Sequence, residues 1–439
     1  MRLLCLIKQF QIYLANKTGN QMKDLAEELK EYRVKFSNEL DNILLYWIRY
    51  GVEKDGHGFY GAVNLDGVPD LEANKTSVLN ARILWTYSGA AIKYGRKEYS
   101  EIADKAYKVV TEDFADSQFG GYFMELTSDN SIANDIKHTY AQAFVIYALC
   151  KYYEFRRLDS TFEIISNFFF LFEEKAKDKS NAGYLESFNR NWDLYSENRM
   201  ADNNEPKSMN THLHVLEAYS ALYKVWKDNR VKVRLAELMD IFLNKIIRPD
   251  GHFGIFYDNA FNESEASKGI CSFGHDIEGS WLLLEAAEIL GDPAVIDRMK
   301  KVSITMVDAV DRTGVDKDGG LFLESVRYGS HVRTNKHWWL QAETLVGFMN
   351  AFQMTGDLKY WETVKLTWKF IDDCVIDHKR GEWFAKVNRL GIPYLTEPED
   401  DPSPYYRNDR KIDPWKCPYH NGRAMMELIM RIDKILIEK

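Results

Sequence analysis

The segment FGGYFMELTSD at residues 119–129 decides the fold, because five segments of the same kind recur along the chain. Each combines glycine, which suits a turn, with aromatic and β-branched residues, which suit a short β-hairpin. The other five are GHGFYGAVNLDG (56–67), AGYLESFNRNW (182–192), GHFGIFYDN (251–259), GGLFLESVRYG (319–329) and RGEWFAKVNRLG (380–391). Their marker glycines, separated by 62, 63, 71, 66 and 61 residues, are Gly58, Gly120, Gly183, Gly254, Gly320 and Gly381. Periods of this length indicate a repeated supersecondary unit.

Two helical patterns lie between successive glycine segments. Residues 79–95 and 99–114 form one such pair, and residues 211–226 and 233–247 form another, with apolar residues recurring at intervals of three and four. The first helix of each pair is apolar around its girth, whereas the second carries charge on one face. This difference is typical of an inner helix that an outer helix covers.

The pairs predict an all-α fold, an (α/α)6 barrel or toroid of six helical hairpins with short β-hairpins at one end. Helices at about residues 24–50 and 421–437 complete the ring. A linear solenoid of helical pairs is the alternative, but six pairs suit closure and the 14% aromatic content suits a concave pocket. No glycine- or serine-rich linker divides the chain, so we expect a single catalytic domain at 22–439 after an N-terminal extension at 1–21.

The composition excludes several classes of protein. Lysine and arginine total 57 against 66 acidic residues, a net charge of -9, so a nucleic-acid partner is not expected. The five cysteines are scattered and form no CxxC pair, which favours a reducing, cytoplasmic location. Lys8 and Gln9 interrupt the apolar N-terminus, which argues against a signal peptide. No apolar run is long enough to span a membrane.

Histidines recur near the predicted starts of the first helix of each pair, and in a toroid these starts meet at one end. Helix N-termini carry partial positive charge, which favours neutral imidazole, the form that a general base needs. The six are His138, His212, His214, His275, His337 and His420.

The segment GHDIEG places His275 and Glu278 three residues apart on one helical face. We expect Glu278 to hold the His275 imidazole in one tautomer; the alternative is a capping carboxylate beside a surface histidine. The histidine spacings match no zinc pattern, so no metal is expected.

Asn210, His214 and Glu217 share a second face, which favours a pocket over a buried polar network. Arg82, on an otherwise apolar helix, needs a partner, and a ligand oxygen would serve.

Aromatic residues stand near these polar groups. Trp415 lies between Pro414 and Pro418 before the final helix, and either a rigid packed loop or a sugar contact explains it equally well. One of the adjacent residues Trp338 and Trp339 must face inwards, where a flat apolar face suits a sugar. No GxGxxG in a βαβ context, P-loop or GxSxG elbow is present, so no nucleotide cofactor is implied.

The runs THLHVLEAY, GHDIEGSWLLLEA, HWWLQAE and DPWKCPYHNGR resemble signature segments of the N-acylglucosamine 2-epimerase superfamily. The similarity extends from about residue 24 to residue 437. The last run most resembles the branch that acts on β-linked disaccharides such as cellobiose and lactose. The resemblance implies an (α/α)6 barrel and cofactor-independent interconversion of the glucose and mannose configurations at the reducing end.

The resemblance also implies roles for single residues. His275 and His420 would be the acid/base pair, one on each face of C2. Arg82 would stabilise the enediolate oxygens, and His214 would help ring opening. The residues that would shape the pocket are Tyr140, Asn210, Glu278, Trp338 and Trp415, with the two tryptophans stacking on sugars. The chain departs from the family pattern at Gly422, where serine is more frequent, and at Asn259-Ala260, where acidic or aromatic residues are usual.

Alternative functions remain open at this point. One is an N-acylglucosamine 2-epimerase or a mannose isomerase of the same fold. Another is an (α/α)6 glycoside hydrolase, which needs two carboxylates, for example Asp276 or Glu278 with Glu217. A sugar-binding module without activity is the simplest alternative. The expected partner is a small disaccharide, with the chain a monomer or weak homodimer and with no membrane or nucleic acid involved.

Overall fold

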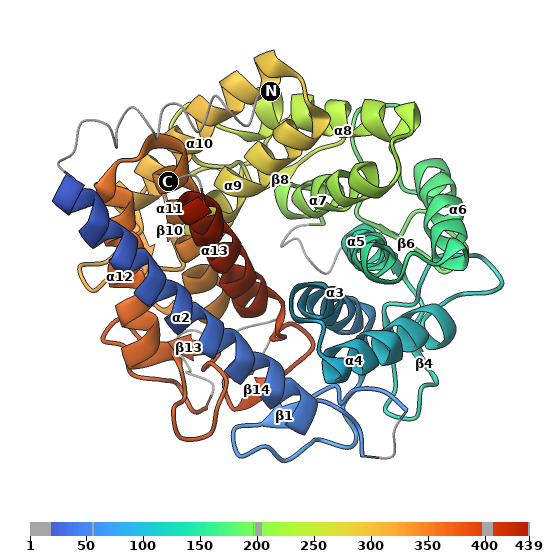
Figure 1. Ribbon diagram of the computed structural model, residues 1–439. Helices are drawn as coiled ribbons and strands as arrows, with labels where there is room; N and C mark the ends of the chain where they lie inside the picture. The colour runs from blue at the N-terminus through green and yellow to red at the C-terminus, as the bar shows by residue number, and fades with distance from the viewer. Residues whose placement is uncertain (1–18, 55–56, 196, 198–203, 397–406, 438–439) are drawn as a thin grey trace.

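The computed structural model describes residues 19–54, 57–195, 197, 204–396 and 407–437. In the described part of the chain, six inner helices surround the centre of a ring, and six outer helices cover them (Figure 1). The (α/α)6 barrel is therefore confirmed, and the linear solenoid is wrong. The inner helices are α3 (Ser77–Tyr94), α5 (Thr139–Arg156), α7 (Met209–Val225), α9 (Phe273–Leu290), α11 (Trp338–Thr355) and α13 (Tyr419–Ile437). The outer helices are α2 (Gly19–Tyr50), α4 (Lys97–Lys108), α6 (Asp159–Lys175), α8 (Asn229–Ile241), α10 (Pro293–Thr313) and α12 (Leu358–Phe370).

The two sets of helices differ in burial as their sequences predict. The inner helices are buried almost all round in their first halves, whereas the outer helices bury one stripe and expose charged residues. Among the described residues, no helix combines the length and the apolar character that crossing a membrane requires. Three of the outer α-helices that the structure describes are continued by a five-residue π-turn. These turns are η1 (Val109–Asp113) after α4, η2 (Phe242–Ile246) after α8 and η3 (Ile371–Val375) after α12. The turns η1 and η2 lie within the helices predicted at 99–114 and 233–247.

The two ends of the chain close the ring. Helix α2 packs along α13, where Arg33 forms an ion pair with Asp433, and its other side meets α12. There the Glu28 carboxylate accepts hydrogen bonds from the Trp361 indole at 2.8 Å and the Lys365 ammonium at 2.7 Å. The sixth pair is thus built from the first and last helices. Helix α2 begins at Gly19 rather than near residue 24; residues 1–18 of the predicted extension lie outside the described residues.

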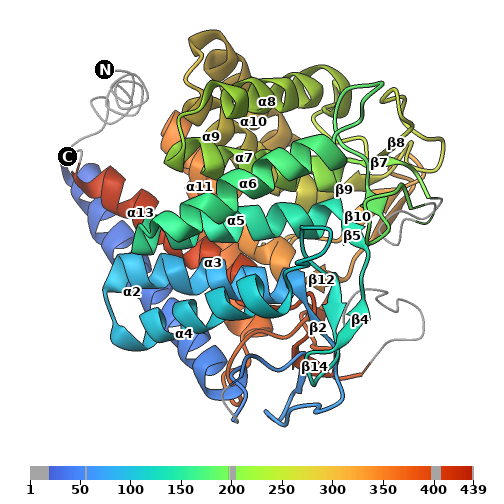
Figure 2. The same ribbon diagram turned by 90° about the vertical axis from the view of Figure 1, so that its right-hand side faces the viewer.

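Short strands gather at one end of the barrel, where every inner helix begins (Figure 2). The prediction of one hairpin per glycine segment is only partly right. Over the residues that the structure describes, each segment is joined to the residues just before it by an isolated bridge, as between Ala115 and Tyr122, and four segments have a second bridge to the residues that follow, as between Phe188 and Leu194. The ladders of the described residues instead join neighbouring units: β2–β3, β5–β6, β7–β8, β9–β10, β12–β13 and β14–β1, whereas β3–β4 and β10–β11 are local pairs. The strands are β1 (Val63–Asn64), β2 (Lys75–Thr76), β3 (Glu125–Leu126), β4 (Ile132–Asn134), β5 (Lys137–His138), β6 (Ser187–Phe188), β7 (Lys207–Ser208), β8 (Phe256–Tyr257), β9 (Cys271–Ser272), β10 (Glu324–Val326), β11 (His331–Arg333), β12 (Lys336–His337), β13 (Lys386–Val387) and β14 (Arg410–Ile412).

A buried ion pair repeats with the strands. In five of the described units, a lysine in the strand that precedes an inner helix pairs with an acidic residue that follows the preceding outer helix; four of these lysines are two residues before the helix, and Lys411 is eight residues before α13. The pairs are Lys75–Glu53 at 2.6 Å, Lys137–Asp116 at 3.0 Å, Lys207–Asp178 at 2.8 Å, Lys336–Asp316 at 3.1 Å and Lys411–Asp377 at 3.1 Å. In the fourth unit Cys271 replaces the lysine, and the Arg248 guanidinium donates to nearby carbonyl oxygens instead. These pairs fix the loops that carry the inner helix starts.

Candidate active site

The predicted histidines do lie at or near the starts of inner helices, at the strand end of the barrel. His138 and His337 are the N-cap residues of α5 and α11. The other four belong to the first two turns of α7, α9 and α13 and come from different sides of the ring: His212, His214, His275 and His420. Toroid closure therefore brings together residues that are far apart in sequence.

Trp339 of α11 links the two histidines of the predicted acid/base pair. Its ring centroid lies 4.9 Å from that of His275 and 5.5 Å from that of His420. Trp339 is half-buried, whereas Trp338 is only 2% exposed and has the Lys416 ammonium 5.8 Å from its ring centroid. Trp339 therefore lies beside the two histidines, whereas the resemblance indicates its neighbour Trp338. The sugar contact of Trp338 stays a prediction.

The expectation that Glu278 holds His275 is wrong. His275 Nδ1 lies 2.8 Å from the Ser272 hydroxyl, while the Glu278 carboxylate accepts a 2.6 Å hydrogen bond from Arg423. The i,i+3 spacing places the two residues on one face, but the guanidinium attracts the carboxylate more strongly than a neutral ring does. Burial lowers the pKa of His275 to about 4, so the imidazole is neutral at physiological pH.

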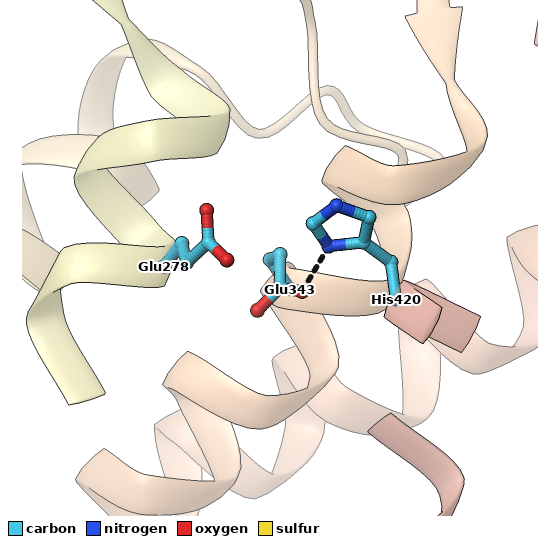
Figure 3. A group of neighbouring side chains, drawn as sticks. All are labelled: Glu278, Glu343 and His420. Carbon is cyan, nitrogen blue, oxygen red and sulfur yellow. Dashed lines mark hydrogen bonds and ion pairs between the residues drawn. The ribbon is translucent and has the colours of Figure 1, made fainter. Parts of the chain in front are cut away.

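His420 has a carboxylate partner instead. Its Nδ1 lies 2.7 Å from Oε1 of Glu343 on α11, and Figure 3 shows this contact beside Glu278 of α9. Burial holds the pKa of His420 well below its ordinary value, so this ring is also neutral. Sequence reasoning missed Glu343, although a glutamate within an apolar inner helix was a usable signal.

Arg423 links its own helix, α13, to three other inner helices through a carboxylate on each of them. Its guanidinium, on α13 and 1% exposed, bonds Glu217 at 2.5 Å, Glu278 at 2.6 Å and Glu343 at 2.7 Å. Sequence reasoning missed this residue too, although it follows His420 by three positions. Donor atoms of Glu278, Glu343 and His420 lie within 4.8 Å of one another, as a metal site requires. The guanidinium already bonds both carboxylates, however, so these residues fit a buried ion-pair network better than a metal centre.

His214 belongs to the same network. Its Nδ1 lies 3.0 Å from Glu217, whose other oxygen accepts a 2.7 Å hydrogen bond from the Tyr419 hydroxyl. Burial opposes ionisation of Glu217, but Arg423 and His214 outweigh it and lower its pKa. The third member of the predicted stripe, Asn210, is half-buried, and its side-chain oxygen has no hydrogen-bond partner among the described residues.

Arg82 finds its partners within the protein. Its guanidinium donates to the Tyr140 hydroxyl at 2.7 Å and to the main-chain oxygen of Trp415 at 3.4 Å, and it lies 4.3 Å from the centroid of the Phe144 ring. The Trp415 ring centroid is 5.8 Å from that of Tyr140. The Nε donor of Arg82 has no hydrogen-bond partner among the described residues, so one N–H remains for an oxygen ligand.

His212 and Asp276 belong to the scaffold rather than to the site. Four inner helices carry, as their fourth residue, a polar side chain that accepts a backbone N–H of the preceding glycine segment. These acceptors are Gln142 for Tyr122 at 3.0 Å, His212 for Tyr184 at 3.0 Å, Asp276 for Phe253 at 2.8 Å and Gln341 for Leu321 at 2.7 Å. Asp276 also holds His252 at 2.7 Å, so it is not free to act on a glycosidic bond.

Known proteins resemble the chain over most of its length. The N-acylglucosamine 2-epimerase family model matches residues 58–406. Cellobiose 2-epimerases from Bacteroides fragilis and Ruminococcus albus are 38% and 34% identical, covering 88% and 89% of this chain and 95% and 96% of their own. The cellobiose 2-epimerase structure from Bacillus thermoamylovorans superimposes with a TM-score of 0.83 at 32% identity, over 92% of this chain and all of that one. The chain therefore belongs to the N-acylglucosamine 2-epimerase family, in its cellobiose 2-epimerase branch, and is a carbohydrate epimerase.

Proposed function

We propose that the protein inverts C2 of the reducing-end sugar of β-1,4-linked disaccharides, without a cofactor. Cellobiose would become glucosyl-mannose, and lactose would also react. The observation that carries the proposal is the placement of two neutral histidines, His275 and His420, against the Trp339 ring. The disaccharide comes from the names of the relatives, several of which are cellobiose 2-epimerases.

Inversion at C2 needs two groups because the proton must leave one face and return to the other. In the open-chain aldose, the C1 carbonyl acidifies the C2 proton. One histidine removes this proton through its unprotonated nitrogen, which forms a cis-enediolate. The second histidine is neutral in the free protein. It therefore has to bind a proton from water as negative charge develops on the enediolate, and it then delivers that proton to the opposite face of C2.

Arg82 and His214 support these steps in the proposal. The enediolate carries negative charge on its oxygens, and preorganised donors stabilise such charge strongly in a water-poor site. The buried Arg82 guanidinium, with its unpartnered Nε donor, suits this role. His214 would open the sugar ring, while Tyr140, Asn210, Glu278, Trp338 and Trp415 would shape the pocket.

The test is incubation of the purified protein with cellobiose in deuterium oxide. We expect an epimer that carries deuterium at C2, detected by NMR and mass spectrometry. Absence of both exchange and epimer with cellobiose, lactose and mannobiose would refute the proposal. Mannose and N-acetylglucosamine in the same panel identify a monosaccharide epimerase or isomerase.

The hydrolase alternative predicts release of free glucose from cellobiose. It needs two carboxylates that flank the bond. Glu217 and Glu278 are both bonded to Arg423, and Asp276 holds His252, so none of the three is available for this role in the structure. The mannanase structures that superimpose at 10–12% identity share the fold alone.

A further inference from the structure

Arg423 is the only residue named in the site that touches the carboxylate partners of both His420 and His214. We propose that Arg423 is a positioning residue, which acts through Glu343 and Glu217 to set which ring nitrogen of these histidines carries the proton. The inference rests on the proposed function only where it concerns turnover; the tautomers themselves are a property of the free protein.

Each of the two histidines turns Nδ1 to a carboxylate. His420 Nδ1 is 2.7 Å from Glu343, and His214 Nδ1 is 3.0 Å from Glu217. An ionised carboxylate only accepts hydrogen bonds, so Nδ1 must carry the proton and donate it. In the neutral ring of His420, Nε2 is then left with the lone pair that a general base needs.

The arrangement works only while both carboxylates are ionised. Burial raises the pKa of Glu343, and the Arg423 guanidinium opposes this rise at 2.7 Å. A protonated Glu343 would donate to His420 Nδ1 rather than accept from it. The proton of the ring would then sit on Nε2, and His420 could no longer act as a base there. Because Arg423 bonds both Glu343 and Glu217, it keeps the two carboxylates as acceptors and the proton on Nδ1 of each ring.

His275 differs in a way that suits a two-histidine reaction. Its Nδ1 faces the Ser272 hydroxyl at 2.8 Å, and a hydroxyl can donate or accept. This partner tolerates either tautomer and the imidazolium, and it brings no charge. His420 is therefore fixed by a charged network, whereas His275 is not. Arg423 and Glu343 should accordingly control one limb of the pH profile and leave the other unchanged.

Several charged or titratable groups surround His420, and the pH profile reports on them together. They come from five inner helices: Glu343 of α11, Glu278 of α9, His214 of α7, Arg82 of α3, and Tyr419 and Arg423 of α13. Of these, Glu343 is the one hydrogen-bonded to the ring. Its replacement by glutamine therefore removes one charge and retains the shape.

The experiment compares Glu343→Gln and Arg423→Lys with a matched control, Glu39→Gln. Glu39 is also a buried helical glutamate that accepts an indole N–H, from Trp383 at 2.7 Å, as Glu343 does from Trp281 at 3.1 Å. Glu39 lies on the outer helix α2, whereas Glu343 lies on the inner helix α11. For each protein, kcat and KM for cellobiose are measured against pH, and ¹⁵N-histidine NMR identifies the protonated ring nitrogens.

We expect kcat of Glu343→Gln to fall by about 10²- to 10⁴-fold, the contribution of a positioned general base, with KM little changed. The pH limb that belongs to His420 should move to lower pH, because the imidazolium loses its carboxylate. NMR should show protonation at Nε2 appearing in the variant, while Glu39→Gln keeps the wild-type spectrum and turnover.

Three results would overturn the inference: a loss of kcat with neither limb displaced, unchanged tautomers in Glu343→Gln, or an equal loss in Glu39→Gln. Each would show that Glu343 matters only for stability. If Arg423→Lys does not fold, Glu343→Gln still tests whether the carboxylate that Arg423 bonds sets the tautomer of His420. If the wild-type protein epimerises no sugar, the proposed function fails, but the NMR comparison still tests the tautomers.

Discussion

Removal of one buried lysine should destabilise the barrel far more than removal of an exposed lysine with the same ion-pair distance. The Lys207 ammonium is 2.8 Å from Asp178, 2.7 Å from the Ala182 carbonyl oxygen and 2.6 Å from that of Asn259. Lys35 is 2.8 Å from Glu31, but both side chains are exposed. The ion pairs that Lys207→Met and Lys35→Met remove therefore differ mainly in how deeply they are buried.

The structure gives the magnitude of the effect. Burial opposes ionisation of Asp178, but Lys207 and two backbone N–H groups outweigh it and lower its pKa from 3.8 to about 2. At about 1.4 kcal/mol per pKa unit, the folded protein favours the Asp178 carboxylate by about 2 kcal/mol. Burial lowers the pKa of Lys207, so part of this gain offsets the cost of desolvating the ammonium. Lys207→Met also leaves two carbonyl acceptors without a donor. We expect a loss of about 3 kcal/mol, in the range for a broken buried pair.

The assay is urea unfolding followed by circular dichroism, with Lys35→Met expected to change the free energy of unfolding by less than about 1 kcal/mol. Because the folded pKa of Asp178 is depressed, its stabilisation is complete above the unfolded pKa and is lost as pH falls towards about 2. The difference in the free energy of unfolding between wild type and Lys207→Met should thus be the same at pH 7 and at pH 5. A loss below about 1 kcal/mol for Lys207→Met, or equal losses for the two variants, would refute the reasoning.

Three further predictions concern the site. His275→Ala and His420→Ala should each lower kcat for cellobiose by at least about 10²-fold while the circular dichroism spectrum and Tm are retained; activity that survives in either variant removes that residue from the acid/base pair. Trp339→Leu and Trp338→Leu should each raise KM about 3- to 10-fold through lost aromatic contact; steady-state kinetics in which Trp338→Leu leaves KM unchanged, while thermal melts show a lower Tm, would remove Trp338 from the pocket. Arg82→Met should lower kcat by about 10²- to 10³-fold with a smaller change in KM, and unchanged single-turnover rates would exclude a role for Arg82 in stabilising charge.

The sequence by itself was enough to predict the ring of helices. Glycine segments at a period of 61 to 71 residues, apolar periodicity and helix-capping residues are local properties, and local properties determine where helices begin. The histidines at the helix starts could therefore be located correctly. The strands could not, because two-residue ladders such as β5–β6 pair segments of neighbouring units that only the closed ring brings together.

Only the tertiary structure decided which side chains are partners in the site. Sequence spacing places Glu278 near His275, but it does not reveal a guanidinium that arrives from another helix and binds that carboxylate instead. Glu343 and His420 are 77 positions apart and meet because α11 and α13 are adjacent in the ring. The choice between Trp338 and Trp339 depends on the rotation of α11 about its axis, which packing against both neighbouring helices determines. Local periodicity therefore specified the elements, whereas long-range packing and charge pairing specified the site.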